Sequence, residues 1–371
     1  MLRSTHVTIR RDALRNNIEL ARRCLDPKTK LLAVIKANAY GHGIVEVGQY
    51  LQANRLADYL AVAIVEEGVK LRQNGVHLPI LILGATDDEH LSSAIENDLS
   101  LAIFTTHSLL ALQAEAKRSN KQAKIHIKID SGMHRIGIQT EQAMCEFISV
   151  LATCPNILFE GIFTHFAMAD TSDVEYTNMQ ADKFHSMVRI VNAAGYNPIV
   201  HCCNSGGIFQ HSQFQDDMVR LGISLYGCPI NDKVDARHDL MPVLSWQTCV
   251  VNLFTLQAGQ SLSYGLRYTT DRPIKVATLA VGYGDGYKRC LTNKAEVLIG
   301  GRRCKQIGTI CMDQMMVDVS DVPDVAIGSE VVLIGTQGNE TITADQIAEW
   351  AGTISYEILL SISERVPRIY R

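Results

Sequence analysis

The apolar run LLAVI, residues 31–35, leads directly into Lys36 and then into the glycine-punctuated segment ANAYGHG. An ammonium group at the end of a buried strand costs free energy unless it is solvated, paired or used covalently. Lys36 is therefore either a surface lysine just beyond a strand or a Schiff-base lysine, which burial makes nucleophilic by lowering its pKa. Its position alone leaves both interpretations open.

Two later apolar runs are followed by small residues that could bind a phosphate. Asn204, Ser205 and two glycines follow one run, and Gly222 and Ile223 follow the next. In a parallel barrel, the loops after the seventh and eighth strands expose backbone N–H groups to phosphate. A lysine facing such a cradle indicates pyridoxal 5'-phosphate as the cofactor, although the sequence NSGG alone is also typical of ordinary turns.

The elements that must position these residues alternate between short apolar runs and longer amphipathic stretches. This alternation predicts the α/β class, with an N-terminal parallel (β/α)8 TIM-like barrel. The alternative is an open doubly wound sheet, but eight strand candidates and the lack of a G-x-G-x-x-G opening favour the barrel. The strand candidates are LLAVI, YLAVA, PILIL, SLAIF, KIHIKI, FEGIFTH, PIVHCCN and DMVRLGI.

Two of the amphipathic stretches predict helices that pack on the barrel. The spacing predicts a helix over residues 106–118, with an inward side that contains Leu109, Leu110 and Leu112. It predicts a second helix over residues 174–193. The inward stripe of that helix is expected to contain Met179, Phe184, Val188 and Val191.

The rhythm of the chain changes around residues 231–242, NDKVDARHDLMP. The runs that follow are short, β-like and punctuated by glycines, which predicts a mostly antiparallel β domain. The early run HVTIR could pair with that domain. We therefore expect a cofactor-binding barrel domain over residues 9–238 and a β-rich domain over residues 239–371, joined by a strand within residues 1–8.

Composition narrows the class of protein. The chain has 371 residues, more than one core usually holds, with 47% hydrophobic residues, 20% charged residues and a net charge of -4. No basic cluster suggests binding to nucleic acid or to a membrane. The N-terminus is too charged for a signal peptide, and the ten cysteines are scattered without metal spacing. We expect a cytoplasmic protein with reduced thiols and no metal.

Motifs over nearly the whole chain resemble those of the alanine racemases, which are barrel-type, fold type III pyridoxal-phosphate enzymes. AVIKANAYGHG resembles their cofactor-lysine motif, and IKIDSGMHRIG, FTHFAMAD, HCCNSGG, VRLGISLYG, SLSYGLRYTT, VGYGDGY, GTICMDQ and RVPRIYR follow in order. The resemblance implies an isomerase that interconverts L-alanine and D-alanine and supplies D-alanine for cell-wall peptidoglycan. It also implies a head-to-tail homodimer in which the β-rich domain of one chain completes the active site of the other.

The resemblance assigns two proton carriers to opposite faces of the substrate α-carbon. Lys36 would hold the cofactor and take the proton from the D-enantiomer, and Tyr264, in SLSYG, would take it from the L-enantiomer. A tyrosine base needs a lowered pKa or a nearby proton acceptor. Apart from the resemblance, Tyr264 is more typical of a tyrosine packed in a β domain.

Three basic residues complete the predicted reaction centre. Arg220, in VRLG, matches the arginine that faces the pyridine nitrogen, and since it cannot give up its proton, that nitrogen stays unprotonated. Arg135, in GMHRIG, matches the arginine that meets the substrate carboxylate. Lys128 matches a lysine that is carbamylated in many family members, so its modification here is an open possibility.

The remaining assignments concern the phosphate and the substrate entrance. Tyr40, Tyr356, Ser205 and the backbone of Gly222 and Ile223 match the phosphate cradle, and Asn204 would support it. The backbone N–H of Met312 matches a binder of the substrate carboxylate, flanked by Cys311 and Asp313. Finally, His165 would lie near the ring or Arg220, Tyr283 matches an entryway tyrosine, and Gly284 departs from the more common alanine, a change expected to loosen the loop.

Three alternatives stay open. A barrel-type amino-acid decarboxylase would place an acid where Arg220 is expected. A non-enzymatic pyridoxal-phosphate carrier would lack the β-rich domain. A racemase of another small amino acid such as serine is harder to separate, because one extra group in a pocket changes binding by only about 1–3 kcal/mol.

Overall fold

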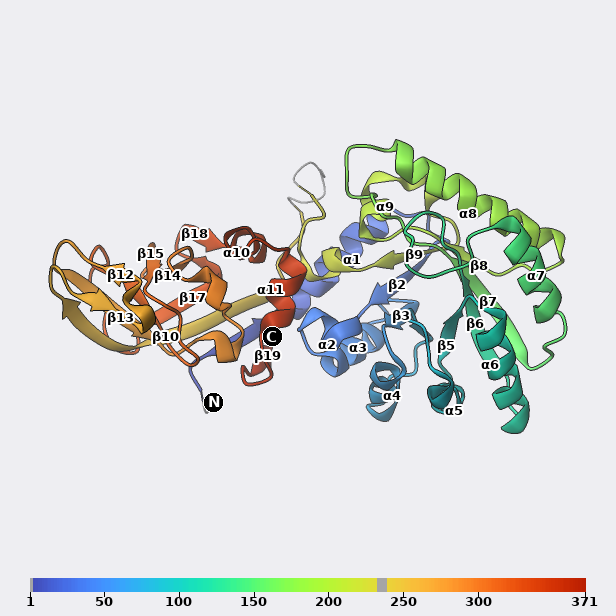
Figure 1. Cartoon of the computed structure of the whole chain (residues 1–371), viewed down its shortest axis with the longest axis horizontal. Helices are drawn as coiled ribbons and strands as arrows, with labels where there is room; N and C mark the ends of the chain where they lie inside the picture. Colours follow the sequence, from blue (N-terminus) through green and yellow to red (C-terminus); the bar gives the residue numbers. More distant parts are fainter. Residues whose placement is uncertain (1–2, 232–238) are drawn as a thin grey trace. The chain divides into compact units, whose positions relative to one another are not determined.

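The computed structural model describes residues 3–231 and 239–371, and Figure 1 shows its ribbon. The chain divides into two compact units. The barrel unit comprises Arg15–Ala39 and Gly43–Leu240, and the β unit comprises Met1–Leu14, Tyr40–His42 and Met241–Arg371. The change of rhythm expected at residues 231–242 includes residues 232–238, which lie outside the described part of the chain.

The barrel unit contains a sheet of eight parallel strands in the order β8-β7-β6-β5-β4-β3-β2-β9. The Arg220 amide donates to the Cys203 carbonyl at 2.9 Å and the Asp217 amide donates to the Val200 carbonyl at 3.1 Å, which nearly closes the sheet between β8 and β9. The predicted parallel barrel is therefore confirmed. The strands are β2 (Lys30–Val34), β3 (Tyr59–Val62), β4 (Ile80–Ile82), β5 (Ser100–Ile103), β6 (Ala123–Lys128), β7 (Ile157–Phe163), β8 (Ile199–His201) and β9 (Met218–Leu221).

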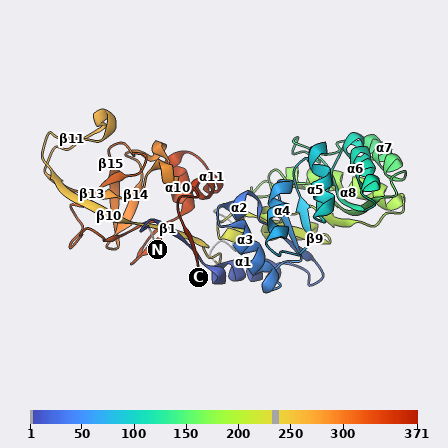
Figure 2. The same ribbon diagram turned by 90° about the horizontal axis from the view of Figure 1, so that it is seen from below.

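Helices cover the outer side of this sheet, as Figures 1 and 2 show. Side-chain caps start two of them, since Thr105 accepts from the Ser108 amide at 3.1 Å and Thr140 accepts from the Ala143 amide at 3.2 Å. The helical segments are α1 (Arg11–Arg23), α2 (Lys36–Tyr40), α3 (Ile44–Ala53), α4 (Val65–Gln73), α5 (Leu91–Glu96), α6 (Thr106–Arg118), α7 (Glu141–Leu151), α8 (Glu175–Ala193) and α9 (Ser205–Gln210).

Both predicted helices are present as α6 and α8, but each inward stripe was wrong at one residue. Leu110 is 50% exposed, because it lies one position, or about 100° around the helix, from the buried Leu109. Met179 is 46% exposed, because it lies about 140° around the helix from Phe184. The polar Gln180 is buried on the inner side of α8, where its oxygen accepts from the Ala167 amide at 2.8 Å.

The β unit contains a nine-stranded sheet in the order β18-β17-β14-β15-β16-β13-β10-β1-β19, with a further pairing of β17 with β10. Its strands pair antiparallel except β1 with β19, so the mostly antiparallel β domain is confirmed. The members are β1 (His6–Ile9), β10 (Leu244–Leu256), β13 (Ile274–Leu279), β14 (Glu296–Ile299), β15 (Arg302–Ile307), β16 (Met315–Asp318), β17 (Glu330–Gln337), β18 (Glu340–Ile342) and β19 (Arg368–Tyr370), with the small sheet β11 (Ser261–Leu262) and β12 (Tyr268–Thr269) and the helices α10 (Ala344–Ala351) and α11 (Ser355–Ser361).

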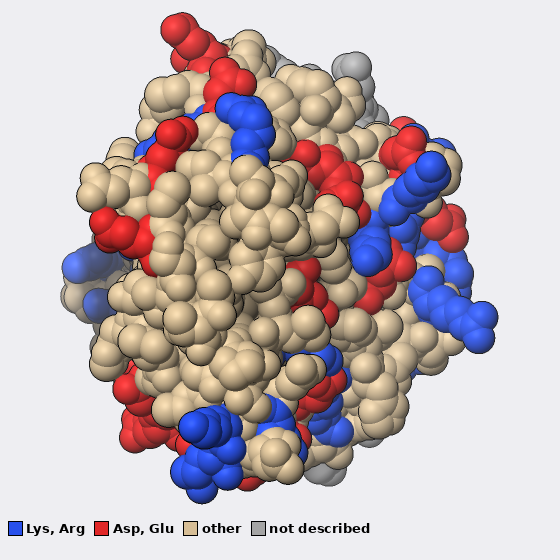
Figure 3. All heavy atoms as spheres, turned by 90° about the vertical axis from the view of Figure 1, so that its right-hand side faces the viewer, with Lys and Arg blue, Asp and Glu red and all other residues tan. Residues whose placement is uncertain are grey.

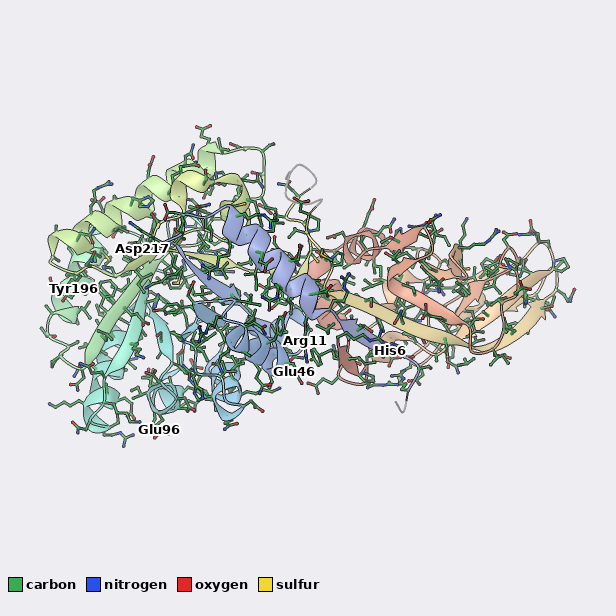
Figure 4. All side chains as sticks on the ribbon, turned by 180° about the vertical axis from the view of Figure 1, so that it is seen from behind. His6, Arg11, Glu46, Glu96, Tyr196 and Asp217 are labelled. Carbon is green, nitrogen blue, oxygen red and sulfur yellow. The ribbon has the colours of Figure 1, made fainter. Side chains whose placement is uncertain are left out.

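The first strand, β1, lies between β10 and the last strand, β19. Figure 4 labels His6 on β1 and Arg11 at the start of α1. The Arg371 amide donates to the Ile9 carbonyl at 2.9 Å, and the Arg11 amide donates to the Arg371 carbonyl at 2.8 Å. Both ends of the described chain are therefore held in one sheet.

The surface carries charges of both signs. On the face shown in Figure 3, lysine and arginine side chains alternate with aspartate and glutamate, with no large field of either sign. No helix in the described ranges combines the length and the apolar character that crossing a bilayer requires.

Candidate active site

Lys36 follows β2 and opens a left-handed turn. The four residues from Ala37 to Tyr40 have φ angles between 51° and 54°, a conformation that costs an L-residue roughly 1–2 kcal/mol. Hydrogen bonds hold the turn from both sides: Asn38 Oδ1 accepts the first amide of α3 at 3.0 Å, and the Ala37 amide donates to Glu67 Oε1 at 2.5 Å. Consecutive strained residues of this kind cluster at functional sites.

The Lys36 amine lies in an environment that favours its neutral form. Burial lowers the pKa of Lys36, and the positive charge of Arg135 lowers it further, while the Glu67 carboxylate raises it. The net direction is downward, so a larger fraction of Lys36 is free amine at neutral pH than for an exposed lysine. This observation favours the covalent interpretation of Lys36 over a solvated surface lysine.

Four cations act on one histidine at this end of the barrel unit. Burial lowers the pKa of His165 well below its ordinary value, and Arg220, Arg135, Lys128 and Lys36 each lower it further. His165 is therefore neutral. The barrel unit thus brings these five predicted site residues into one electropositive cluster, which suits an anionic ligand.

Lys128 is almost fully buried at the end of β6. Its Nζ donates to the Ile129 carbonyl at 2.6 Å and lies 5.4 Å from the centre of the Phe163 ring. Burial lowers the pKa of Lys128 to about 7, with a further lowering by Arg220 and an opposing effect of Asp130. A substantial share of this lysine is thus unprotonated at neutral pH.

Arg220 is held on β9 by neutral acceptors. Its Nη1 donates to His201 Nδ1 at 3.0 Å and to the His201 carbonyl at 2.9 Å, and its Nη2 donates to the carbonyls of Thr164 at 2.6 Å and Cys202 at 2.8 Å. Burial lowers the pKa of Arg220 to about 10, which still leaves it protonated. Its Nε makes no hydrogen bond within the described ranges, so one donor remains for a ligand. The guanidinium of the exposed Arg135 likewise makes no hydrogen bond within the described ranges, so all of its donors remain for a ligand.

The loop after β8 and the start of the segment after β9 meet at the predicted phosphate cradle. Asn204 Oδ1 accepts from the Gly207 amide at 3.0 Å, which agrees with a supporting role. The Gly222 amide donates to Ser205 Oγ at 3.0 Å, so two predicted cradle groups are in contact. The buried Ser224 hydroxyl has no partner among the described residues. Nothing in the segment GISLYG had indicated this additional donor.

In the β unit, Tyr40 and Tyr356 lie together. Their ring centres are 5.8 Å apart. Burial raises the pKa of Tyr40 to about 12, so its hydroxyl keeps its proton. Two side chains predicted to bind the phosphate therefore lie next to each other. Tyr40 is protonated, so its hydroxyl can donate to an anion.

Three loops of the β unit bring Tyr264, Tyr283 and Met312 to one region. The Tyr264 carbonyl accepts from Thr309 Oγ1 at 2.6 Å. The amide of Tyr283 donates to the Cys311 carbonyl at 3.1 Å, and the next amide donates to the Met312 carbonyl at 2.8 Å. All three predicted side chains point outward, with exposures of 71% for Tyr264, 40% for Tyr283 and 53% for Met312.

A buried carboxylate anchors the loop that carries Tyr283. Asp285 accepts from Arg3 at 2.6 and 2.8 Å and from the Gly282 amide at 3.1 Å. Arg365 lies 3.5 Å from the same carboxylate and donates to Asp313 at 2.7 Å. The ion pairs join the Tyr283 loop to the residue that follows Met312. The Arg365 guanidinium occupies the space that a Cβ at Gly284 would need, and the effect of this glycine on the loop stays a prediction.

The donors in the barrel unit fit pyridoxal 5'-phosphate. The electropositive cluster, the Ser205 hydroxyl and the unpartnered Ser224 hydroxyl suit its phosphate and phenolic oxygens, and the free Arg220 Nε suits an acceptor such as a ring nitrogen. Lys36 supplies an amine with a lowered pKa. The chemistry of this set thus agrees with the group expected from the sequence.

Comparison with known proteins gives the same answer over both units. Residues 9–229 match the family model "Alanine racemase, N-terminal domain" and residues 243–370 match "Alanine racemase, C-terminal domain". The alanine racemase of Symbiobacterium thermophilum is 43% identical over 371 residues, which cover 100% of this chain and 97% of that protein.

Solved structures agree. The alanine racemase of Clostridium difficile 630 superposes with a TM-score of 0.94 at 39% identity, covering 100% of this chain and 96% of that one. Alanine racemase from Bacillus anthracis with bound L-Ala-P gives 0.93 at 35% identity, with coverage of 100% and 96%. The chain belongs to the alanine racemase family of enzymes.

Proposed function

We propose that this chain interconverts L-alanine and D-alanine with pyridoxal 5'-phosphate held in the barrel unit. The observation that carries the proposal is the convergence of Lys36, Lys128, Arg135 and Arg220 around the neutral His165. Such a cluster fits an anionic cofactor and an anionic substrate together. When bound, pyridoxal phosphate supplies an electron sink that makes the α-proton of an amino acid removable.

The chain's own residues would hold the cofactor from several directions. Lys36 is the covalent attachment point, and Arg220 Nε donates to the pyridine nitrogen. Because an arginine does not surrender its proton, that nitrogen stays unprotonated and the electron sink is weaker. The phosphate is held by the hydroxyls of Tyr40, Ser205 and Tyr356 and by the backbone of Gly222 and Ile223, with Asn204 as support.

Two side chains would move the proton at the substrate α-carbon. Lys36 takes it from D-alanine as a free amine, a role that its lowered pKa supports. Tyr264 takes it from L-alanine on the opposite face, and its exposure leaves the phenol free to reach a substrate. Each base returns a proton when the other has removed one, so the reaction runs in both directions.

The substrate carboxylate would be bound by Arg135 and by the backbone N–H of Met312. Arg135 has its five donors available among the described residues, and a guanidinium matches a planar carboxylate. Carbamylation of Lys128 would place a negative group near Arg135. The amine that reacts with carbon dioxide is the unprotonated one, and the pKa of about 7 supports its presence.

A head-to-tail homodimer would complete each site. Tyr264, Tyr283 and Met312 belong to the β unit, whereas Lys36 and Arg135 belong to the barrel unit. In the proposed dimer, Tyr264 of the partner subunit faces the Lys36 of the first chain. The physiological product would be D-alanine for cell-wall peptide, made in the cytoplasm.

Polarimetry of each alanine enantiomer with added pyridoxal phosphate tests the reaction. Wild-type enzyme should bring both enantiomers to the same racemic end point, and Lys36→Ala should abolish both activities and the visible absorbance of the attached cofactor. Tyr264→Phe should keep the absorbance but lose most of the racemisation. Faster turnover of serine, or release of carbon dioxide, would replace the proposal with one of the alternatives.

Mixing the two inactive variants tests the shared site. Lys36→Ala carries an intact Tyr264, and Tyr264→Phe carries an intact Lys36, so an exchanged dimer holds one complete site of two. Mixed chains should recover up to about a quarter of wild-type activity under exchange, since half the dimers are mixed and each has one working site. No recovery despite proven exchange would contradict sharing.

A further inference from the structure

A continuous chain of hydrogen bonds runs inside the barrel unit behind Arg220. Arg220 Nη1 lies 3.0 Å from His201 Nδ1, His201 Nε2 lies 2.9 Å from His126 Nδ1, and His126 Nε2 lies 3.1 Å from Glu160 Oε2. We call these four residues the relay. Both imidazoles are completely buried, so water does not compete for their nitrogens.

The arginine fixes the direction of every bond in the relay. A guanidinium has donors only, so His201 Nδ1 must be the acceptor and carry no proton. The proton of neutral His201 is then on Nε2 and is donated to His126 Nδ1, which leaves His126 Nε2–H to donate to Glu160. Burial is the largest cause that lowers the pKa of both histidines, in agreement with two neutral rings.

Local backbone geometry brings Glu160 to this position. The register of β6 with β7 shifts between Ile125 and His126, so that Ile125 pairs with Phe159 and His126 pairs with Gly161. Glu160 is the extra residue of this bulge, a feature that re-aims a side chain. A side chain at Gly161 would overlap the His126 ring, so only glycine leaves room for the imidazole.

Further contacts hold Glu160 and His201 in the relay. Ser100 Oγ donates to Glu160 Oε2 at 2.5 Å, and the Tyr59 hydroxyl donates to Oε1 at 3.4 Å. The Phe163 ring stacks on His201 at 5.0 Å with an angle of 7° between the planes. The other ionisable groups that act on the relay are Lys124 beside Glu160 and Lys128 beside His201. Cys202, Cys203 and Asp216 act on Arg220.

We infer that His126 and Glu160 are positioning residues, which act through His201 to hold the Arg220 guanidinium in one orientation without a direct carboxylate partner. A carboxylate in contact with Arg220 would neutralise the charge that the proposed function places at the cofactor ring. The relay instead places the negative charge of Glu160 two imidazole rings away from Arg220. The role of the relay in cofactor chemistry rests on the proposed function, whereas the hydrogen bonds of the relay do not depend on it.

Nitrogen NMR of the full chain, labelled with ¹⁵N only in its 12 histidines, tests the relay with and without added cofactor. In the wild type, His201 and His126 should each show one neutral tautomer, protonated on Nε2, from pH 6 to pH 8. Glu160→Gln keeps the shape of the side chain but removes the charge, and an amide can also donate, so the single tautomers should give way to shifted or mixed signals. His201→Asn and His126→Asn assign the resonances.

The kinetic readout separates positioning from simple destabilisation. Glu160→Gln should lower kcat by roughly 10- to 100-fold, as partners behind a first ring of ligands often do, with KM for alanine changed less than about threefold because Arg135 and Met312 are untouched. Ser100→Ala removes one hydroxyl and should cause smaller changes of the same kind. Gln113→Ala, which breaks a 3.0 Å bond to Asn156 away from the relay in the barrel unit, is the matched control.

Several results would overturn the inference. These are a wild-type His201 protonated on Nδ1, identical relay signals in wild type and Glu160→Gln, and equal loss of kcat in Gln113→Ala. The wild-type tautomer needs no variant, so the inference stays testable even if Glu160→Gln does not fold. A chain with the expected tautomers but no racemase activity would instead contradict the proposed function and leave the relay standing.

Discussion

The guanidinium of Arg365 donates to the carboxylate of Asp313, the residue after Met312, at 2.7 Å. The same arginine lies 3.5 Å from the buried Asp285, which anchors the Tyr283 loop. Arg365 therefore ties two loops that carry predicted substrate-facing residues. Its pair with Asp313 is exposed on both sides, so the contribution of that pair to overall stability is small.

Asp313→Ala should affect substrate binding more than folding. Exposed ion pairs contribute about 0.2–1 kcal/mol, so the melting temperature should change little, while a looser Met312 backbone should raise KM for alanine about two- to fivefold. Steady-state kinetics and calorimetry measure the two effects. Asp271→Ala, at an exposed aspartate of the same unit, is the control and should change neither.

Gly284→Ala and Gly282→Ala should differ sharply in stability. A Cβ at Gly284 would come within 2.5 Å of the mobile end of Arg365 and 3.0 Å of the Met312 carbonyl, so small shifts relieve it. A Cβ at Gly282 would overlap the backbone carbonyls of Cys311 and Met312, which cannot move aside. We expect a loss of less than about 1.5 kcal/mol at Gly284 and more than about 3 kcal/mol at Gly282 in urea unfolding. Equal losses would rule out this account.

Lys128 should make stability depend on pH. Its pKa is about 7 in the folded chain and 10.5 ordinarily, so the unfolded chain binds more protons between these values. The free energy of unfolding therefore rises with pH across this window, by roughly 1.4 kcal/mol per unit. Lys128→Met lacks this dependence, so its stability relative to wild type should increase as pH falls from 9 to 7.

Urea unfolding at pH 7, 8 and 9 in buffer free of carbon dioxide measures that difference. Lys121→Met, at an exposed position, is the control and should run parallel to the wild type. If the stability of Lys128→Met changed with pH in the same way as that of the wild type, Lys128 would not bind fewer protons in the folded chain than in the unfolded chain.

The left-handed turn after Lys36 should respond to glycine in opposite ways at two positions. Ala37 is exposed, so Ala37→Gly removes backbone strain without losing a buried methyl group, and should stabilise the chain by up to about 1 kcal/mol. Ala39 is fully buried, so Ala39→Gly loses about 0.8 kcal/mol from the burial of its methyl group. This loss offsets the relief of backbone strain, and the variant should be close to neutral in stability. Chemical denaturation of both variants measures the difference, and a destabilised Ala37→Gly would contradict the strain.

The sequence predicted what depends on local pattern. The strands of the barrel are short apolar runs bounded by turns, and helix 106–118 has a threonine cap before it, so both follow from residue order. Leu110 and Met179 were assigned inward because they are apolar, although helix geometry places them outward. The left-handed turn was not predictable, because nothing local favours four such residues and the bonds from Glu67 and Asn38 are tertiary.

The site residues also divide into those that a local pattern predicts and those that it does not. Lys36 and Ser205 stand directly after strands, so their approximate place could be deduced from the order of elements. His126, Glu160 and Ser224 carried no local signal. Their roles depend on a register shift between β6 and β7 and on the barrel interior, which only the folded chain reveals.

The position of β1 between β10 and β19 has a consequence for biosynthesis. A ribosome releases β1 before the eight barrel strands, and the segment that contains β19 follows all of them. The opening strand must therefore wait for more than 300 residues before its parallel neighbour exists. All the barrel strands are therefore made before the nine-stranded sheet of the β unit can be completed. Loss of residues 368–370 would thus leave β1 with an unpaired edge, a hazard for aggregation in the newly made chain.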